Sequence, residues 1–122
     1  MKIINYYIPV VVLFLLSCGK GDRIAPEISI TIPTENQVFT SGQSVNIKAR
    51  ISDNNGIQSM HLSVNDFISG ASIFELDEFP NENAYNLNTN FKVQHSKKYI
   101  IHVEVTDYHE NVSKKEVTIA VN

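Results

Sequence analysis

Apolar and polar residues alternate with a period of two along most of the chain beyond residue 25. Val45, Ile47, Ala49 and Ile51, for example, share one face of a run whose other face is polar. The other apolar rows are Ile28, Ile30 and Ile32; Met60, Leu62 and Val64; Tyr85, Leu87, Thr89, Phe91 and Val93; Tyr99, Ile101, Val103 and Val105; and Val117, Ile119 and Val121. Strict alternation is typical of half-buried antiparallel strands.

Turn-forming residues separate these rows. They lie at Pro33–Asn36, Ser41–Gly42, Asp53–Gly56, Ser69–Gly70 and Pro80–Asn83. Gly and Asn accept a positive φ, and short polar side chains hydrogen-bond to the nearby backbone in turns. One further strand is expected within residues 73–79. About seven short strands at this spacing predict an all-β protein, an antiparallel β-sandwich.

Several segments resemble the bacterial immunoglobulin-like domains of surface and polysaccharide-handling proteins. They are Pro26–Ile30, Ser41–Val45, Ile51–Ile57 and Val103–Asp107, the last followed by Glu110 and Asn111. The resemblance covers nearly all of residues 25–122 and implies an immunoglobulin-like sandwich used for protein interaction or structural support. The chain departs from the family at Tyr108-His109, where small residues are common. It also lacks the two cysteines and the tryptophan that form a disulfide packed against an indole ring in other immunoglobulin domains. Apolar packing alone must therefore hold the core.

The resemblance further implies which loops share an end of the sandwich. The loops Asp53–Gly56, Pro80–Ala84 and Asp107–Asn111 are expected at the end where the chain enters the first strand. The loops Pro33–Gly42, Asn65–Ser72 and Gln94–Lys98 are expected at the opposite end.

The segment 1–17 has a different pattern. Lys2 precedes the apolar run Ile8–Leu16, and Ser17 precedes Cys18, the only cysteine of the chain. A basic N-terminal region, a short apolar segment and a small residue before the expected cleavage site indicate a secretory signal peptide. With cysteine after the cut, the segment resembles the lipobox of bacterial lipoproteins, which implies cleavage before Cys18 and a thiol carrying lipid chains such as palmitate.

Two alternatives remain for this segment, a cleaved signal with an incidental cysteine and an uncleaved anchor. The apolar run is shorter than the roughly 20 residues that span a bilayer as a helix. We expect a signal peptide over residues 1–17, a lipidated cysteine and tether over 18–25, and one domain over 26–122. Gly19, rather than Asp, follows the cysteine, which favours the outer membrane of the cell envelope if the cell is Gram-negative.

Charge excludes one class of partner. Removal of the segment 1–17 takes away Lys2, so the net charge falls from −3 to −4 over the rest of the chain. The remaining length suits a single domain. A mildly acidic surface argues against nucleic-acid binding, which requires a basic face. The expected partners are therefore the membrane, through the lipid, and an envelope protein or glycan.

Acidic residues in the turns near the chain entry are candidate calcium ligands. Asp53, Glu82, Asp107 and Glu110 lie in loops expected at one end. Calcium takes six to eight oxygen ligands, which such loops can supply. The alternative is that these side chains only form the turns. We expect no other cofactor.

Three histidines are weaker candidates for a zinc site. His61 and His102 are expected on the outward face of neighbouring strands, and His109 lies in the loop that follows. A solvated sheet face accounts for them equally well, because two histidines rarely complete a zinc site.

No pattern in the chain indicates an enzyme. Nucleophile-elbow, phosphate-loop and metalloprotease-helix motifs are missing from the sequence. Asp77 and Glu78 are adjacent in an expected strand, so they point to opposite faces and cannot act as a pair.

A glycan-binding module is the alternative to a protein-binding one, and exposed aromatic residues on a flat sheet face would favour it.

The candidate partner-binding residues are Phe67 and Ile68. With Ile73 and Phe74 they place four apolar side chains in and around a Gly- and Ser-containing loop. They form either a flap folded over the core, which is the preferred interpretation, or an exposed contact patch.

Overall fold

The computed structural model describes residues 21, 23–95 and 97–122, and their regular structure is β-sheet. The strands are β1 (Glu27–Ile32), β2 (Gln37–Phe39), β3 (Ser44–Asp66), β4 (Ser72–Glu78), β5 (Glu82–Lys92), β6 (Lys98–Asp107) and β7 (Val112–Val121). Within these residues no helix has the length and apolar character needed to cross a membrane.

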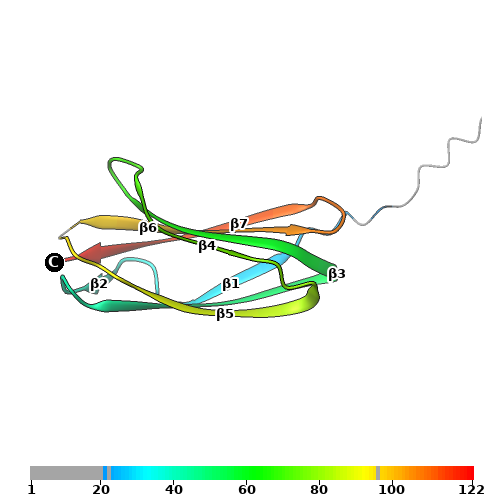
Figure 1. Ribbon diagram of the computed structural model, residues 1–122, viewed down its shortest axis with the longest axis horizontal. Helices are drawn as coiled ribbons and strands as arrows, with labels where there is room; N and C mark the ends of the chain where they lie inside the picture. The colour runs from blue at the N-terminus through cyan, green and yellow to red at the C-terminus, as the bar shows by residue number, and fades with distance from the viewer. Residues whose placement is uncertain (1–20, 22, 96) are drawn as a thin grey trace, which may run out of the picture.

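The strands form the two layers of a sandwich that is antiparallel except where β2 joins β7, and β3 belongs to both layers (Figure 1). The first part of β3 pairs with β1 and β5, and its second part pairs with β4 and β6. β7 extends the second layer beyond β6. The antiparallel sandwich expected from the alternation is confirmed, and its strand arrangement agrees with the immunoglobulin-like fold that the resemblance implied.

The segment Asp53–Gly56 carries β3 from one layer to the other. Regular pairing with β5 ends at Ser52, and pairing with β6 starts at Ile57. Asp53 Oδ2 accepts a hydrogen bond from the amide of Asn55 at 2.9 Å, and Gly56 has a φ of +104°. The turn chemistry read from the sequence is therefore present, but the prediction of two separate strands is wrong: the chain bends across the sandwich and remains one strand.

The predicted loop Pro33–Gly42 contains a short strand that the alternation did not reveal. β2 pairs with β7 in parallel, with Val38 opposite Ala120. The amide of Asn122 donates to the carbonyl of Phe39 at 2.9 Å, and the Phe39 ring is buried. Three residues are too few to show a period of two, which explains why this strand was missed.

The core lies between the layers and consists of the inward rows of the strands. Its largest fully buried side chains are Ile47, Ile51, Ile57, Met60, Leu62, Ile101 and Ile119. The predicted inward row of β1 is wrong at its end, because Ile32 is 36% exposed while Ile28 is buried. The pairing of β1 with β3 shifts register between Ile30 and Ile32, which turns the last residue out of the row.

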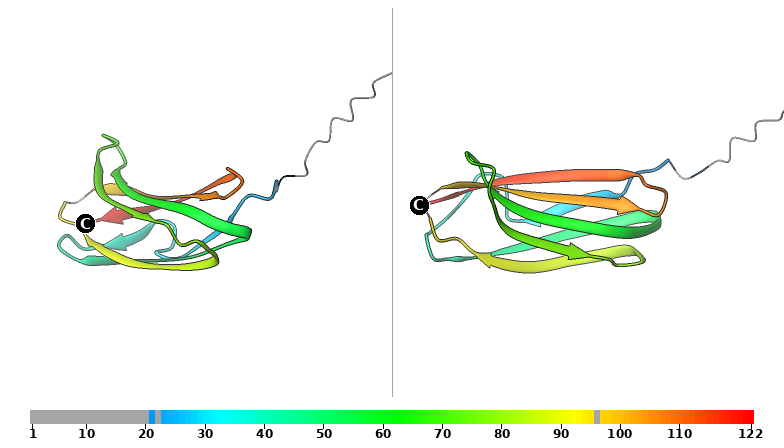
Figure 2. Two further views of the ribbon diagram at one scale, coloured as in Figure 1. Left: turned by 45° about the vertical axis from the view of Figure 1, so that its right-hand side comes forward. Right: turned by 45° about the horizontal axis from the view of Figure 1, so that its top comes forward.

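The two ends of the sandwich carry the loops expected of them. The chain enters β1 at the end that holds the β6–β7 turn and the β4–β5 connection (Figure 1). The β3–β4 turn, the β5–β6 connection and the C-terminus lie at the opposite end, which we call the distal end (Figure 2).

Burial of Ile47 provides a test of the layer assignment. The side chain is fully buried, so we expect Ile47→Asp to unfold the domain. An unpaired charge in the core costs several kcal/mol, and the typical total stability of a domain is only about 5–15 kcal/mol. Asn46→Asp adds the same group one residue earlier on the exposed face and should change the melting temperature little. Thermal melts followed by circular dichroism measure the stability of both variants. An equal loss of stability in the two variants would mean that the two faces of β3 are misassigned.

Candidate functional site

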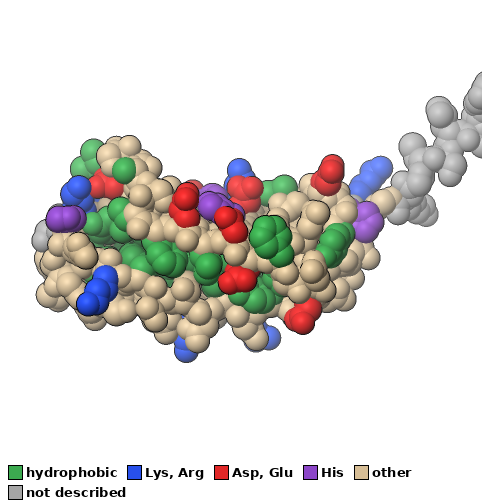
Figure 3. Space-filling model, viewed as in Figure 1, with side chains coloured by type: hydrophobic (Ala, Val, Ile, Leu, Met, Phe, Trp, Pro, Cys, Tyr) green, Lys and Arg blue, Asp and Glu red, His purple; other side chains and the backbone are tan. Residues whose placement is uncertain are grey.

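The candidate partner-binding residues lie at the tip of the β3–β4 turn. Phe67 is 51% exposed and Ile68 is 94% exposed. Hydrophobic side chains of this turn stand at the upper left of the space-filling view (Figure 3). The preferred interpretation, a flap folded over the core, is therefore wrong for these two residues, because both side chains are exposed.

The other two apolar residues of the predicted flap point in different directions. Phe74 packs against the core, and its ring stacks on that of Phe91 with 5.9 Å between the ring centres. Ile73, one residue earlier on β4, is 46% exposed. Alternation along β4 separates them, because successive side chains of a strand point to opposite faces.

Asp66 fixes the shape of the turn. Its Oδ1 accepts hydrogen bonds from the amides of Ile68 at 2.8 Å and Ser69 at 3.0 Å. Its own amide donates to the carbonyl of Ala71, and its carbonyl accepts from the amide of Gly70, which has a φ of +72°. A residue with a Cβ is disfavoured at that positive φ. The apolar tip is thus held by a closed set of hydrogen bonds.

Lys97 holds the same carboxylate from the β5–β6 connection. Lys97 Nζ lies 2.9 Å from Asp66 Oδ2, and the Asp66 side chain is nearly fully buried. The amide of Ser69, the Lys97 ammonium and the amide of Ile68 together hold the pKa of Asp66 at about 2, below the ordinary 3.8. Hydrogen bonds to the charged form and a nearby opposite charge both favour ionisation. Asp66 is therefore charged at neutral pH, and it joins two connections of the distal end that are far apart in sequence.

A depression of about 440 Å³ lies beside the tip, lined by Asp66, Phe67, Ile68, Ser69, Lys97 and Lys98. Lys98 Nζ stands 5.9 Å from the centre of the Phe67 ring. This separation is within the range of a cation–π contact. The amide of Phe67 donates to the carbonyl of Lys98 at 3.0 Å. An apolar surface and an exposed cation therefore lie side by side.

The tip thus combines exposed apolar side chains, a neighbouring cation and a backbone held by hydrogen bonds. A rigid apolar tip loses little conformational entropy when a partner covers it. The apolar pattern of the sequence indicated Phe67 and Ile68 but not Asp66 or Lys97. The sequence does contain a feature that indicates the role of Asp66. An Asp followed by Ser69 and Gly70 has the composition of a turn in which the Asp side chain accepts hydrogen bonds from the backbone. No local pattern marks Lys97, because its partner lies 31 residues away.

The calcium candidates act as turn residues. Asp107 is fully buried, and its Oδ1 accepts from the amides of His109 at 2.8 Å and Asn111 at 2.9 Å. Its Oδ2 accepts from Asn111 Nδ2 at 2.8 Å. Glu110 is exposed in the same turn with a φ of +64°. No group of three or more His, Cys, Asp or Glu side chains that could hold a metal occurs among the described residues.

Two of the three histidines, His61 and His102, face carboxylates rather than each other. His61 Nδ1 lies 2.6 Å from Asp77 Oδ1, and His102 Nδ1 lies 3.0 Å from Glu116 Oε1. In the strand pairing His61 is opposite Glu104, whereas His102 is opposite Ser63. His109 lies in the β6–β7 turn at the end of the sheet. The three are therefore not gathered into one ligand set.

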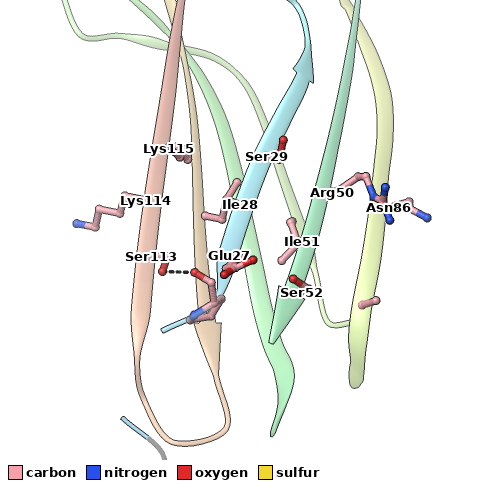
Figure 4. Close-up of a pocket in the computed structure, with 12 residues that line it drawn as sticks. Glu27, Ile28, Ser29, Arg50, Ile51, Ser52, Asn86, Ser113, Lys114 and Lys115 are labelled. Carbon is pink, nitrogen blue, oxygen red and sulfur yellow. Dashed lines mark hydrogen bonds between the residues drawn. The ribbon is translucent and has the colours of Figure 1, made fainter. Parts of the chain in front are cut away.

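A second depression, of about 720 Å³, lies near the chain-entry end of the sandwich (Figure 4). Residues of β1, β3, β5 and β7 line it, and Ser113 Oγ donates to the carbonyl of Pro26 across it. Arg50 extends toward Asn86, whereas Lys114 projects away from β1 (Figure 4). Because its polar groups point in different directions, they define no common binding point.

Cys18, the predicted lipidation site, lies outside the described residues, as does the predicted signal peptide over residues 1–17. Glu82, the remaining calcium candidate, begins β5 and is exposed. Asp77 and Glu78 point to opposite faces as expected, since they are successive residues of β4.

The chain belongs to a family of bacterial immunoglobulin domains. A family model described as "Bacterial Ig domain" matches residues 26–103, which is more than half of the chain. The family match supports an immunoglobulin-like module for protein interaction or structural support. None of the curated proteins compared with the chain matches it.

Solved structures share the fold at low sequence identity. The fibronectin(III)-like modules of Clostridium thermocellum CbhA are 22% identical with a TM-score of 0.57; the match covers 81% of this chain and 47% of that one, about half its length. A superoxide reductase (neelaredoxin) from Ignicoccus hospitalis is 11% identical with a TM-score of 0.58, covering 81% of each chain. The CARDB domain of a Pyrococcus furiosus protein, in complex with di-metal ions, is 16% identical with a TM-score of 0.51, covering 80% and 86%.

The charge of Asp66 predicts an acid-sensitive turn. A carboxyl whose pKa is lower in the folded chain stabilises the fold above its unfolded pKa. That stability is lost as the pH falls from about 3.8 to about 2. Asp66→Asn keeps an oxygen acceptor but removes the charge. We expect this variant to melt at a lower temperature at pH 7 and to lose less stability than the wild type as the pH falls through that window.

The control is Glu27→Gln, at an exposed carboxylate on β1. It should show the same acid dependence as the wild type in thermal melts across that range. Parallel pH curves for the wild type and Asp66→Asn would contradict the assigned role of the carboxylate.

Proposed function

We propose that this chain is a lipid-anchored protein of the bacterial cell envelope whose immunoglobulin-like domain binds another envelope protein through the β3–β4 turn. The observation that carries the proposal is the exposure of Ile68, at 94%, in a turn whose backbone is fixed by Asp66. Burial of this exposed hydrophobic side chain by a partner would be favourable, and the backbone that carries it is already fixed.

The neighbouring charges indicate the chemistry of the partner surface. Lys98 lies over the Phe67 ring, and the Lys97 ammonium already faces Asp66. A partner that places an apolar group on Ile68 and a carboxylate near Lys98 would complement both features. Interfaces commonly combine an apolar centre with a polar rim in this way.

The proposed lipid anchor would set the orientation of the domain relative to the membrane. Chain entry and the β3–β4 turn lie at opposite ends of the sandwich. A lipid on Cys18 with a tether of a few residues would hold the entry end near the bilayer, and the distal end would then project from it. The outer membrane is the favoured location in a Gram-negative cell, because Gly19 rather than Asp follows the cysteine.

Binding of a protein is favoured over binding of a glycan or catalysis. Phe67 lies in the β3–β4 turn, Phe79 after β4 and Tyr108 in the β6–β7 turn, so these exposed rings form no row across a sheet. The outward face of β5 presents Asn86, Asn88 and Asn90. Neither arrangement offers the flat aromatic platform that would favour a glycan.

The anchor is tested by labelling cells with an alkyne-bearing fatty acid. We expect the wild type and Lys20→Ala, a change in the tether, to carry the label after gel separation. Cys18→Ala should carry none and should keep the segment 1–17, because the thiol is the acceptor. Label retained by Cys18→Ala would contradict the lipoprotein assignment.

The partner surface is tested with a photo-crosslinking residue at position 69, next to the tip. We expect Phe67→Ser with Ile68→Ser to lower the yield of one defined crosslinked adduct at least about fivefold, the loss expected from removing two exposed apolar contacts. The melting temperature should change little, because both side chains are exposed.

The matched control is Phe79→Ser, which removes an exposed ring of the opposite end. It should leave the adduct unchanged. An undiminished adduct in the double variant, or a large loss of its stability, would contradict a binding role for the tip.

A further inference from the structure

One side of the sandwich presents two free strand edges. β4 and β5 each pair with β3 alone within the described chain. They lie along the same side of the molecule, one in each layer, in all three ribbon views (Figures 1 and 2). Each therefore has a row of backbone N–H and C=O groups with no strand beside it.

Apolar side chains lie between these two edges. Phe74 and Leu76 of β4 and Tyr85 of β5 pack on the core but are only partly buried. Phe79, in the connection between the two strands, is 68% exposed. The space-filling view shows hydrophobic side chains running between the layers on this side (Figure 3). The core is thus incompletely covered along the open side.

β5 lacks the features that usually protect an edge strand. It has 11 residues, contains no proline, and pairs regularly with β3 from Ala84 to Lys92. Its only charged residues are Glu82 and Lys92, one at each end. Long regular edges without inward charges, bulges or prolines pair readily with another strand. The edge of β4 differs, because Glu75 and Asp77 lie along that strand.

The sequence of β5 complements itself when two copies run antiparallel. If Leu87 of one copy faces Leu87 of the other, Glu82 meets Lys92 at both ends and Asn86 meets Asn88. Opposite charges placed directly across an antiparallel pair are favourable, whereas a parallel pairing would place like charges together. The charge pattern therefore selects a second copy of this chain and one register.

We propose that two copies of the chain pair antiparallel through their β5 edges, centred on Leu87. The β1–β3–β5 layers of both copies then form one continuous sheet, and the apolar band of each copy faces the other. Antiparallel pairing puts the two chain-entry ends at opposite ends of the dimer. If Cys18 carries lipid, the dimer would join copies held on facing membranes.

The proposed register, which places Glu82 opposite Lys92, is tested by measuring dimerisation. The full chain is sedimented over a dilution series, with detergent micelles in large excess. We expect reversible dimers, and Lys92→Glu should weaken dimerisation about fivefold, as two exposed cross-strand pairs become repulsive. Adding Glu82→Lys to that variant restores both pairs and should restore the affinity to within about twofold. Lys115→Glu makes the same change of charge at a position on β7 and should leave dimerisation unchanged.

Position-specific disulfides test the centre of the pairing. Asn86→Cys and Asn88→Cys are placed separately in a Cys18→Ala background, so that each chain has one thiol. Residues directly opposite in an antiparallel pair are close enough for a disulfide. Mild oxidation should give covalent dimers mainly when the two variants are mixed, and few with either alone.

These measurements do not depend on lipid attachment, so they separate the pairing from the anchor. A chain that sediments as a monomer at all concentrations would overturn the proposal. So would charge reversal without effect in folded variants, or crosslinks equal in the mixture and in each single variant. Melting curves of each variant establish that it is folded.

Discussion

The whole sandwich depends on the continuity of β3 across its two layers. This strand pairs with four others, β1 and β5 in one layer and β4 and β6 in the other. Its inward residues supply both sides of the core, from Val45 to Val64. Because the described chain has no disulfide, the bend at Asp53–Gly56 and the packing around it are what hold the layers in register.

The same strand positions the proposed binding tip. β3 ends at Asp66, and this carboxylate organises the turn that follows and accepts the Lys97 ammonium. The apolar tip is thus fixed to the strand that anchors the core. The backbone of this turn is held by hydrogen bonds although it consists of loop residues, and a backbone ordered before binding lowers the entropic cost of binding.

Function in this fold resides in local surfaces. A fibronectin-like module, a superoxide reductase and a CARDB domain share this architecture with the chain at 22%, 11% and 16% identity. Unrelated chemistry on one architecture is expected, because a site is carried by particular side chains. Two features of this chain are local in that sense: the tip around Ile68, which is suited to a partner protein, and the β5 edge, which is suited to a second copy.

The sequence by itself determined the class of fold, because a period of two is a property of each strand alone and shows in rows such as Val45–Ile51. It also determined the turn chemistry at Asp53–Gly56 and the candidates Phe67 and Ile68. Only the tertiary structure decided that β3 crosses the layers without reversing, that β2 pairs with β7, and that Phe67 faces solvent. Each of these depends on contacts between residues far apart in the chain, such as Asp66 with Lys97, which no local pattern encodes.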